Sequence, residues 1–113
     1  MSKGYYNFEG RDNFKKEILQ CLIRKYQRRT AKHIETNRRI SMSPSEIYRP
    51  YGENNADIYV KEEFNKAVSE LELLKMIKTD RLKYSDEIKK IYLLEEAVPS
   101  IYDFLQIEYG IRP

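Results

Sequence analysis

The longest run of periodic apolar residues lies in the first third of the chain. Apolar side chains recur every four residues, and two more widen the stripe: Phe14, Ile18, Leu22 and Tyr26, with Leu19 and Ile23. This spacing places them on one face of a helix. We therefore expect a helix over 12–29, with Asp12 as its N-cap. Residues 30–37 are polar and fit either a helical extension or a loop.

In the next segment the spacing of apolar residues changes from every four residues to every second residue. Residues 39–42 alternate between polar and apolar and predict a short strand. Ser43 is a candidate N-cap, Pro44 suits a first helical position, and Glu46 would complete a capping box. The pattern predicts a brief helix that stops before Pro50. Residues 51–55 have the composition of a turn.

The rest of the chain predicts a helix, a hairpin and a final helix. The helix runs from Asp57 or Ile58 to Lys75, with a core stripe of Val60, Phe64, Ala67, Val68, Leu71 and Leu74. Two strands, 76–84 and 87–95, surround a turn at Ser85-Asp86, and Leu82 and Tyr84 can share one face. The last helix starts near Pro99 and ends at Gly110, with Ile101, Phe104, Leu105 and Tyr109 facing inward.

This order of elements defines an expected fold class. We expect an α+β, mostly helical domain: a winged helix-turn-helix with a small three-stranded antiparallel sheet and a C-terminal helix. The strand at 39–42 is expected to pair with the hairpin. At 113 residues the chain suits one domain. We expect it to span 11–113, after a flexible tail at 1–10.

Positive charge is concentrated in one window. Between Arg24 and Arg39 lie seven basic residues and one acidic residue, a net charge of +6. The whole chain carries only +3, so the remainder sums to −3. Such asymmetry is typical of a protein that binds a polyanion, although a solvated helix end would also carry cations.

Signatures of catalysis are missing from the sequence. The only histidine is His33, the only cysteine is Cys21, and the four glycines form no phosphate-binding loop. We expect no catalytic residue, no metal site, no cofactor and no small-molecule substrate. The start of the chain does not resemble a secretory signal, and no stretch is apolar enough to span a membrane. We therefore expect a cytoplasmic protein.

The expected partner is double-stranded DNA, held mainly through its phosphates. The third helix offers few groups that read bases, and its Glu62, Glu63, Glu70 and Glu72 would repel phosphate. The candidate nucleic-acid-binding residues are Arg24, Arg28, Arg29, Arg38, Arg39, Lys61, Asn65, Lys66, Arg81 and Lys83.

The sequence is also compatible with two other functions. The chain could be a protein–protein docking or dimerisation module, since five tyrosines suit an interface: Tyr5, Tyr6, Tyr48, Tyr51 and Tyr59. It could also be a stand-alone winged-helix transcriptional regulator, which would require one DNA sequence to be strongly preferred.

One stretch resembles a known family. Residues 18–26, ILQCLIRKY, are similar to the "ILxxLLxKYE" opening of the JetD subunit of Wadjet anti-plasmid systems, and so is Asn37-Arg38-Arg39-Ile40 before a short strand. The resemblance covers roughly residues 14–109. Gln27 departs from the pattern, because it stands where the family has an acidic residue.

The resemblance implies a role in a defence system. In that family the amino-terminal winged-helix or arm region assists DNA engagement and dimerisation, and a carboxy-terminal Toprim nuclease domain holds Mg²⁺ with acidic residues. No residue here corresponds to that nuclease domain. The resemblance therefore implies an N-terminal domain of a longer nuclease subunit, possible homodimer or larger complex formation, and no catalytic residue within these positions.

Overall fold

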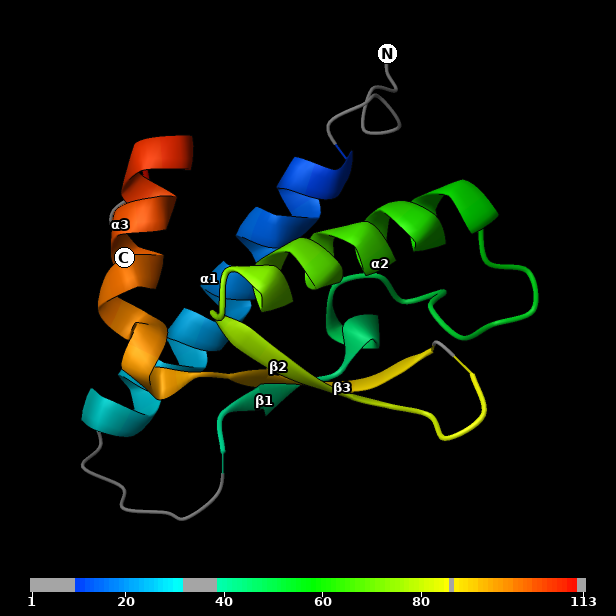
Figure 1. The fold of residues 1–113 in the computed structure, drawn as a ribbon, viewed down its shortest axis with the longest axis horizontal. Coiled ribbons are helices and arrows are strands. Elements are labelled where there is room, and N and C mark those ends of the chain that lie inside the picture. Colours follow the sequence, from blue (N-terminus) through cyan, green and yellow to red (C-terminus); the bar gives the residue numbers. More distant parts are fainter. Residues whose placement is uncertain (1–9, 32–38, 86, 112–113) are drawn as a thin grey trace.

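The structure is a computed structural model that describes residues 10–31, 39–85 and 87–111. In chain order its elements are α1 (Gly10–Ala31), β1 (Ser41–Met42), a 3-10 helix (Pro44–Glu46), α2 (Ile58–Leu73), β2 (Ile77–Arg81), β3 (Ile88–Leu93), a second 3-10 helix (Glu95–Ala97) and α3 (Val98–Tyr109). The expected α+β architecture, mostly helical with a small sheet, is confirmed (Figure 1).

The sheet is antiparallel and has the order β1-β3-β2, so β3 is central. The predicted pairing of the first short strand with the hairpin is confirmed, with Ser41 opposite Tyr92 and Met42 opposite Ile91. Buried residues of the strands face the helices, and α2 runs across that side of the sheet (Figure 1). Burial of one face of each element therefore produces a single core.

The α1 stripe is confirmed, but the start of the helix differs from the prediction. Ile18, Leu19, Leu22 and Ile23 are buried, and Phe14 and Tyr26 pack at the edge of the core. The helix begins at Gly10, so Asp12 lies in its first turn and is not the N-cap. Asp12 instead pairs with Lys15 at 3.1 Å, where a carboxylate near a helix N-terminus is favourable. Gly10 therefore belongs to the helix, and residues 1–9 and 32–38 lie outside the described residues.

The helix before Pro50 is shorter than predicted. Only Pro44–Glu46 is helical, as a single 3-10 turn. The Glu46 carboxylate accepts a hydrogen bond from the Ser43 amide at 2.7 Å, which is the Glu46 half of the predicted capping box. This turn leads directly into the irregular segment 47–57, because Pro50 blocks continuation.

The α2 prediction is confirmed except at its two ends. The Asp57 carboxylate caps the helix by accepting hydrogen bonds from the amides of Tyr59 and Val60. Phe64, Ala67, Val68 and Leu71 are buried. Val60, at the start of the predicted core stripe, is only half-buried and lies outside the core, where it lines a surface groove. The expected core position of Leu74 is wrong, since its side chain is 51% exposed. The helix ends at Leu73, and Lys75 adopts a positive φ of 60°, which turns the chain before the stripe reaches Leu74.

The hairpin strands are also shorter than predicted. Strand pairing in β2 stops at Arg81, and residues 82–85 form the turn, with Asp86 outside the described residues. Leu82 and Tyr84 are therefore exposed, by 45% and 89%. The tip of this hairpin is anchored by the Leu82 amide, which donates to the Glu87 carbonyl at 2.9 Å.

The last helix, α3, agrees with its prediction closely. Ile101 and Leu105 are buried, and Gly110 ends the helix in the left-handed region with φ 67°. Phe104 and Tyr109 pack edge to face, with ring centroids 5.8 Å apart. The Tyr109 hydroxyl donates to the carbonyl of Asp12 at 3.0 Å, so α3 is tied to the first turn of α1.

Tyr51 is the one buried residue that joins the irregular segment to the rest of the fold. The sequence predicts a surface position for it, but its side chain is only 9% exposed. Its hydroxyl accepts a hydrogen bond from the Ile88 amide and donates one to Asn65 Oδ1, both at 2.9 Å. Gly52 follows with a φ of 88°, a conformation that lets the chain turn away at once.

Tyr51→Phe tests the value of this hydroxyl. Removing it leaves the buried Ile88 amide without its acceptor, so we expect a loss of about 1–3 kcal/mol in the free energy of unfolding. Urea denaturation of the purified variant measures this. Tyr84→Phe is the matched control, because Tyr84 is exposed and makes no hydrogen bond among the described residues. Equal stability of the two variants would contradict a structural role for the Tyr51 hydroxyl.

Candidate nucleic-acid interface

Several of the predicted DNA-binding residues already have partners within the fold. Lys61 Nζ lies 3.1 Å from Glu87, and Arg81 lies 2.8 Å from Glu72. Arg29 lies 2.5 Å from Glu95. The amide oxygen of Asn65 accepts the hydrogen bond from Tyr51 described above. These four side chains connect elements of the fold, and their groups are less available to a ligand than the sequence indicates.

The remaining predicted residues are separated from one another. Arg24, Arg28 and Arg39 are exposed and make no ion pair with a described residue. Lys66 is exposed on α2, and Lys83 lies at the hairpin tip with its ammonium 5.5 Å from the Tyr84 ring centroid. Arg38 lies outside the described residues. Arg24 and Arg28 lie one turn apart on α1, whereas Lys66 lies on another helix.

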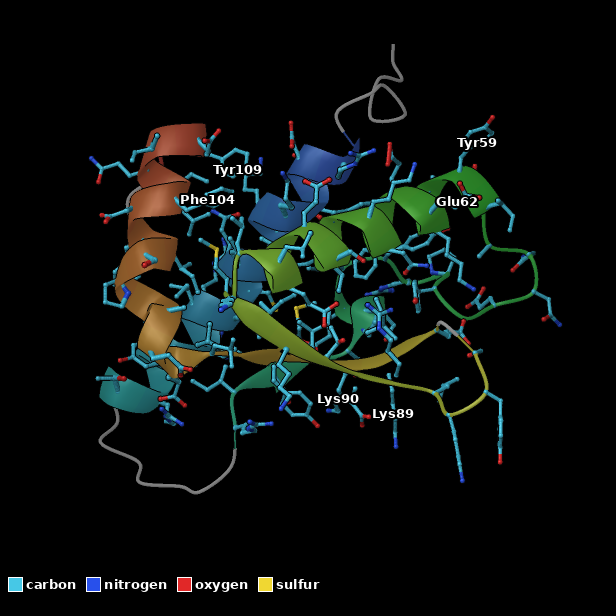
Figure 2. The ribbon with its side chains drawn as sticks, in the orientation of Figure 1. Tyr59, Glu62, Lys89, Lys90, Phe104 and Tyr109 are labelled. Atoms are coloured by element: carbon cyan, nitrogen blue, oxygen red, sulfur yellow. The ribbon has the colours of Figure 1, made fainter. Side chains whose placement is uncertain are left out.

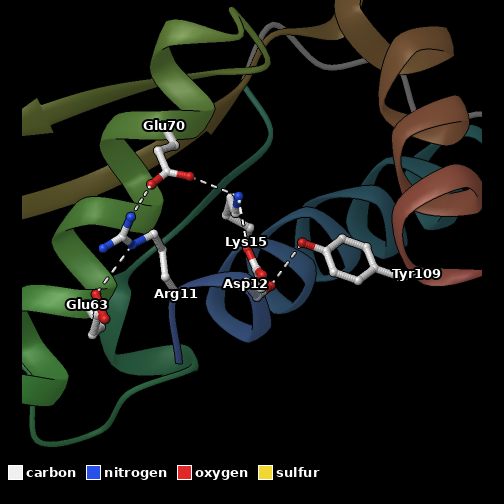
Figure 3. Close-up of polar contacts among 6 residues, drawn as sticks. All are labelled: Arg11, Asp12, Lys15, Glu63, Glu70 and Tyr109. Atoms are coloured by element: carbon white, nitrogen blue, oxygen red, sulfur yellow. Dashed lines mark hydrogen bonds and ion pairs between the residues drawn. The ribbon is translucent and has the colours of Figure 1, made fainter. Parts of the chain in front are cut away.

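Three of the four α2 glutamates are engaged by other elements of the fold. Glu63 and Glu70 pair with Arg11 of α1, at 3.4 and 3.0 Å, and Glu70 also pairs with Lys15 at 2.9 Å (Figure 3). Glu72 bonds the hydroxyl of Thr79 at 2.8 Å as well as Arg81. Of the four, only Glu62 is exposed without an ion pair in the part of the chain that the structure describes. Most of the expected repulsion of phosphate by α2 is therefore neutralised.

The Glu70 carboxylate titrates differently from an isolated one. The hydrogen bond from Lys15 is the main cause that holds its pKa below the ordinary value of 4.5, with partial burial opposing and Arg11 adding to the effect. The charged form is therefore favoured in the folded state. This links the ion pairs between α1 and α2 to the stability of the fold at acidic pH.

The outward face of the sheet carries cations around a tyrosine. The register places Lys78 opposite Tyr92 and Asp80 opposite Lys90, so these side chains share the face away from the helices. The Arg39 guanidinium lies 5.3 Å from the centroid of the Tyr92 ring, within range of a cation–π contact. This face thus combines a ring, several cations and the single carboxylate of Asp80, and no described residue packs over it.

Lys89 joins this face through a β-bulge. Arg81 pairs with Ile88 while Asp80 pairs with Lys90, which leaves Lys89 without a residue opposite it. Lys89 and Lys90 both project on the side of the sheet that faces away from α2 (Figure 2). Tyr59 and Glu62 project from the far side of α2 (Figure 2).

The end of α1 borders this face. Lys25 Nζ donates to the Ser41 carbonyl and to Glu46, both at 2.8 Å, and so fastens α1 to β1. Arg24 and Arg28, one turn apart, remain exposed on the outer side of α1. We call the combined area the basic surface; its residues are Arg24, Arg28, Arg39, Lys78, Lys89 and Lys90.

Four residues of this area are absent from the predicted DNA-binding residues: Lys78, Lys89, Lys90 and Tyr92. Lys78 and Tyr92 are central to it, and both alternate with buried neighbours, Ile77 with Lys78 and Ile91 with Tyr92. That alternation indicates an outward side chain. The sequence does not reveal the register that places Lys78 opposite Tyr92.

Within 10–31, 39–85 and 87–111, no group of three or more His, Cys, Asp or Glu side chains is arranged to hold a metal ion. Burial raises the pKa of the Cys21 thiol, so its protonated, unreactive form is favoured. None of the described helices combines the length and the apolar character that crossing a membrane requires.

Comparison with protein-family models, with curated proteins and with solved structures finds no match to this chain. The resemblance to Wadjet JetD subunits therefore stays a prediction. The geometry of the described residues is the remaining basis for a function.

Glu70→Gln tests the ion pairs between α1 and α2. At pH 7 we expect a loss of less than about 1 kcal/mol, because the groups are partly exposed. The folded-state pKa is lowered, so the stabilisation is present above the unfolded-state pKa and disappears as pH falls below 4.5 through the folded-state value. Urea denaturation of wild type and variant from pH 7 to pH 3 should show their difference vanish. Glu62→Gln, without an ion pair to lose, should show no such trend.

Proposed function

We propose that this chain is a non-catalytic winged-helix module that binds the phosphate backbone of double-stranded DNA through its basic surface. The observation that carries the proposal is that Arg39, Lys78, Lys89 and Lys90 lie on or beside the outward face of the sheet without ion pairs to described residues. Arg24 and Arg28 add exposed cations on α1, which Lys25 fastens to β1. Unpaired cations are the groups that gain most from replacing the counterions around phosphate.

The order of elements supports the winged-helix assignment. A helix, a short strand, a turn, a second long helix and a hairpin follow one another, and the first strand pairs with the last. The winged-helix arrangement uses this order. The helix between β1 and α2 is reduced here to the 3-10 turn Pro44–Glu46, so α2 follows an irregular segment and not a second α-helix.

The outward side of α2 favours backbone contact over base recognition. Its exposed stripe runs Tyr59, Glu62, Lys66, Ser69 and Leu73. One carboxylate, one ammonium and two apolar or aromatic ends offer few of the bidentate groups that read bases in the major groove. A module that docks through its basic surface is expected to distinguish DNA sequences poorly.

Fluorescence anisotropy with two unrelated duplexes of about 20 base pairs tests this proposal. We expect similar affinities for the two duplexes and a steep fall in affinity as salt rises from about 50 to about 200 mM. Lys78→Ala with Lys90→Ala should lower the magnitude of the salt slope by about 2, one unit for each phosphate that is no longer neutralised. Lys66→Ala with Lys75→Ala removes the same charge from α2 and its end, and should leave the slope near the wild-type value.

The same titrations separate the competing modes of binding. A larger loss of affinity in the Lys66 and Lys75 variant would show that α2 enters the DNA and would contradict docking by the basic surface. Absence of binding at the lowest salt concentration would end the proposal. A strong preference for one duplex would instead indicate a sequence-specific regulator.

The second candidate function is self-association, and it rests on exposed apolar residues. Leu73 at the end of α2 is 82% exposed and Ile107 on α3 is 78% exposed. Large exposed apolar side chains are common at protein interfaces.

Sedimentation velocity at low and at high micromolar concentration tests self-association. Concentration-dependent dimers that Leu73→Ser or Ile107→Ser abolishes would support a dimerisation module. A single monomer boundary at both concentrations would contradict it. Leu82→Ser, which changes an exposed leucine at the hairpin tip, is the control and should not alter the distribution.

A further inference from the structure

A groove of about 750 Å³ lies where the first turns of α1 meet the segment 48–57 and the first turns of α2. Its volume falls within the range of ligand-binding sites, about 300–1,000 Å³. The lining includes four carboxylates, those of Glu17, Glu53, Asp57 and Glu63, and no Lys, Arg or His among the described residues. The groove shares no residue with the basic surface, so a ligand bound here would not contact the residues proposed to bind DNA.

Two of the four carboxylates already have partners within the fold. Asp57 caps α2, with its Oδ1 2.9 Å from the Tyr59 amide, and Glu63 pairs with Arg11. Glu17 and Glu53 make no ion pair or side-chain hydrogen bond with any described residue. Partial burial raises the pKa of Glu17, with Lys16 opposing. A cation placed in the groove would offset that cost of charging Glu17.

Aromatic rings complete the walls. Phe14 and Tyr48 lie with ring centroids 6.2 Å apart, and the Tyr48 hydroxyl donates to the Asp57 carbonyl at 3.3 Å, which fixes the ring in place. Tyr59 lines the groove while its side chain stays 81% exposed. Faces of aromatic rings attract cations, as carboxylates do, and also bury the alkyl chain that carries a cation.

We propose that this groove binds a peptide segment of a partner protein that presents a Lys or Arg side chain to Glu17 and Glu53. Charge complementarity indicates that the ligand presents a cationic side chain. The lining offers two unpaired carboxylates and, among the described residues, no positive group. Asn13 and Asn55 also line the groove, and their amides can both donate to and accept from a peptide backbone. A strand of peptide therefore fits the mixture of groups better than an amine alone.

The test measures binding of a fluorescently labelled peptide, acetyl-Gly-Leu-Lys-Leu-Lys-Leu-Gly-amide, to the full chain. Binding is detected by fluorescence anisotropy at physiological salt and neutral pH. A peptide with norleucine in place of each lysine shows how much of the affinity the charge provides. We expect the lysine peptide to bind and the norleucine peptide to bind about tenfold more weakly, or not at all. Butylammonium, added as a competitor, should displace the lysine peptide only at far higher concentration.

Variants with matched charge locate the binding. Glu17→Gln with Glu53→Gln should weaken the lysine peptide about tenfold, the size expected when two charge pairs are removed. Glu62→Gln with Glu108→Gln changes the net charge equally but lies outside the groove, and should change affinity less than about twofold. Tyr59→Ala should weaken binding several-fold, whereas Tyr84→Ala should not. All of these changes affect exposed side chains, and circular dichroism verifies folding.

Several results would overturn the proposal. One is no binding of the lysine peptide at millimolar concentration, and another is equal binding of the norleucine peptide. Equal weakening by the two double variants would mean diffuse attraction to the whole chain. Displacement by butylammonium at the peptide's own concentration would make the ligand a small amine and not a peptide.

Discussion

The hydroxyl of Tyr51 is the contact on which the placement of both surfaces depends. It joins the irregular segment to α2 through Asn65 and to β3 through the amide of Ile88. The amide belongs to the bulged end of the hairpin, beside Lys89. Lys61 strengthens this connection between the irregular segment, α2 and the hairpin. Its ammonium lies 5.3 Å from the Tyr51 ring centroid and pairs with Glu87. The Tyr51 hydroxyl therefore fixes the position of the segment that carries Tyr48 and Glu53 relative to the bulge that presents Lys89.

The helices and the hairpin could be predicted from the sequence because each has a strong period. Four-residue spacing in α1 and α2 placed Ile18, Leu22, Phe64 and Leu71 in the core correctly. Tyr51 could not be predicted in the same way. It stands in a segment rich in Gly and Asn that has no period, and its burial depends on partners 14 and 37 residues away. The prediction for Leu74 is wrong for a related reason, since the stripe continues in the sequence after the helix has ended.

The candidate interface was harder to predict than the fold, because a sequence shows charges but not their partners. Arg29, Lys61 and Arg81 carry the right charge, yet each pairs with a carboxylate that is nine or more residues away. Burying or bridging a cation in this way removes it from competition for phosphate. Lys78 and Tyr92 have an ordinary local sequence, and only the register of the sheet gathers them with Arg39.

The pairing pattern also explains why the net charge of +3 says little about this molecule. At physiological ionic strength, exposed charges more than about 8 Å apart are largely screened from one another. In a molecule of 41 × 35 × 24 Å, a ligand therefore responds to the local imbalance where it docks. Arg11 and Lys15 satisfy Glu63 and Glu70 inside the fold. Unpaired cations then remain on the sheet side, as well as on α2 and at the hairpin tip, and Glu17 and Glu53 remain unpaired in the groove. The proposed DNA-binding surface and the proposed peptide groove have opposite sign and share no residue, so a ligand on one would not contact the residues of the other.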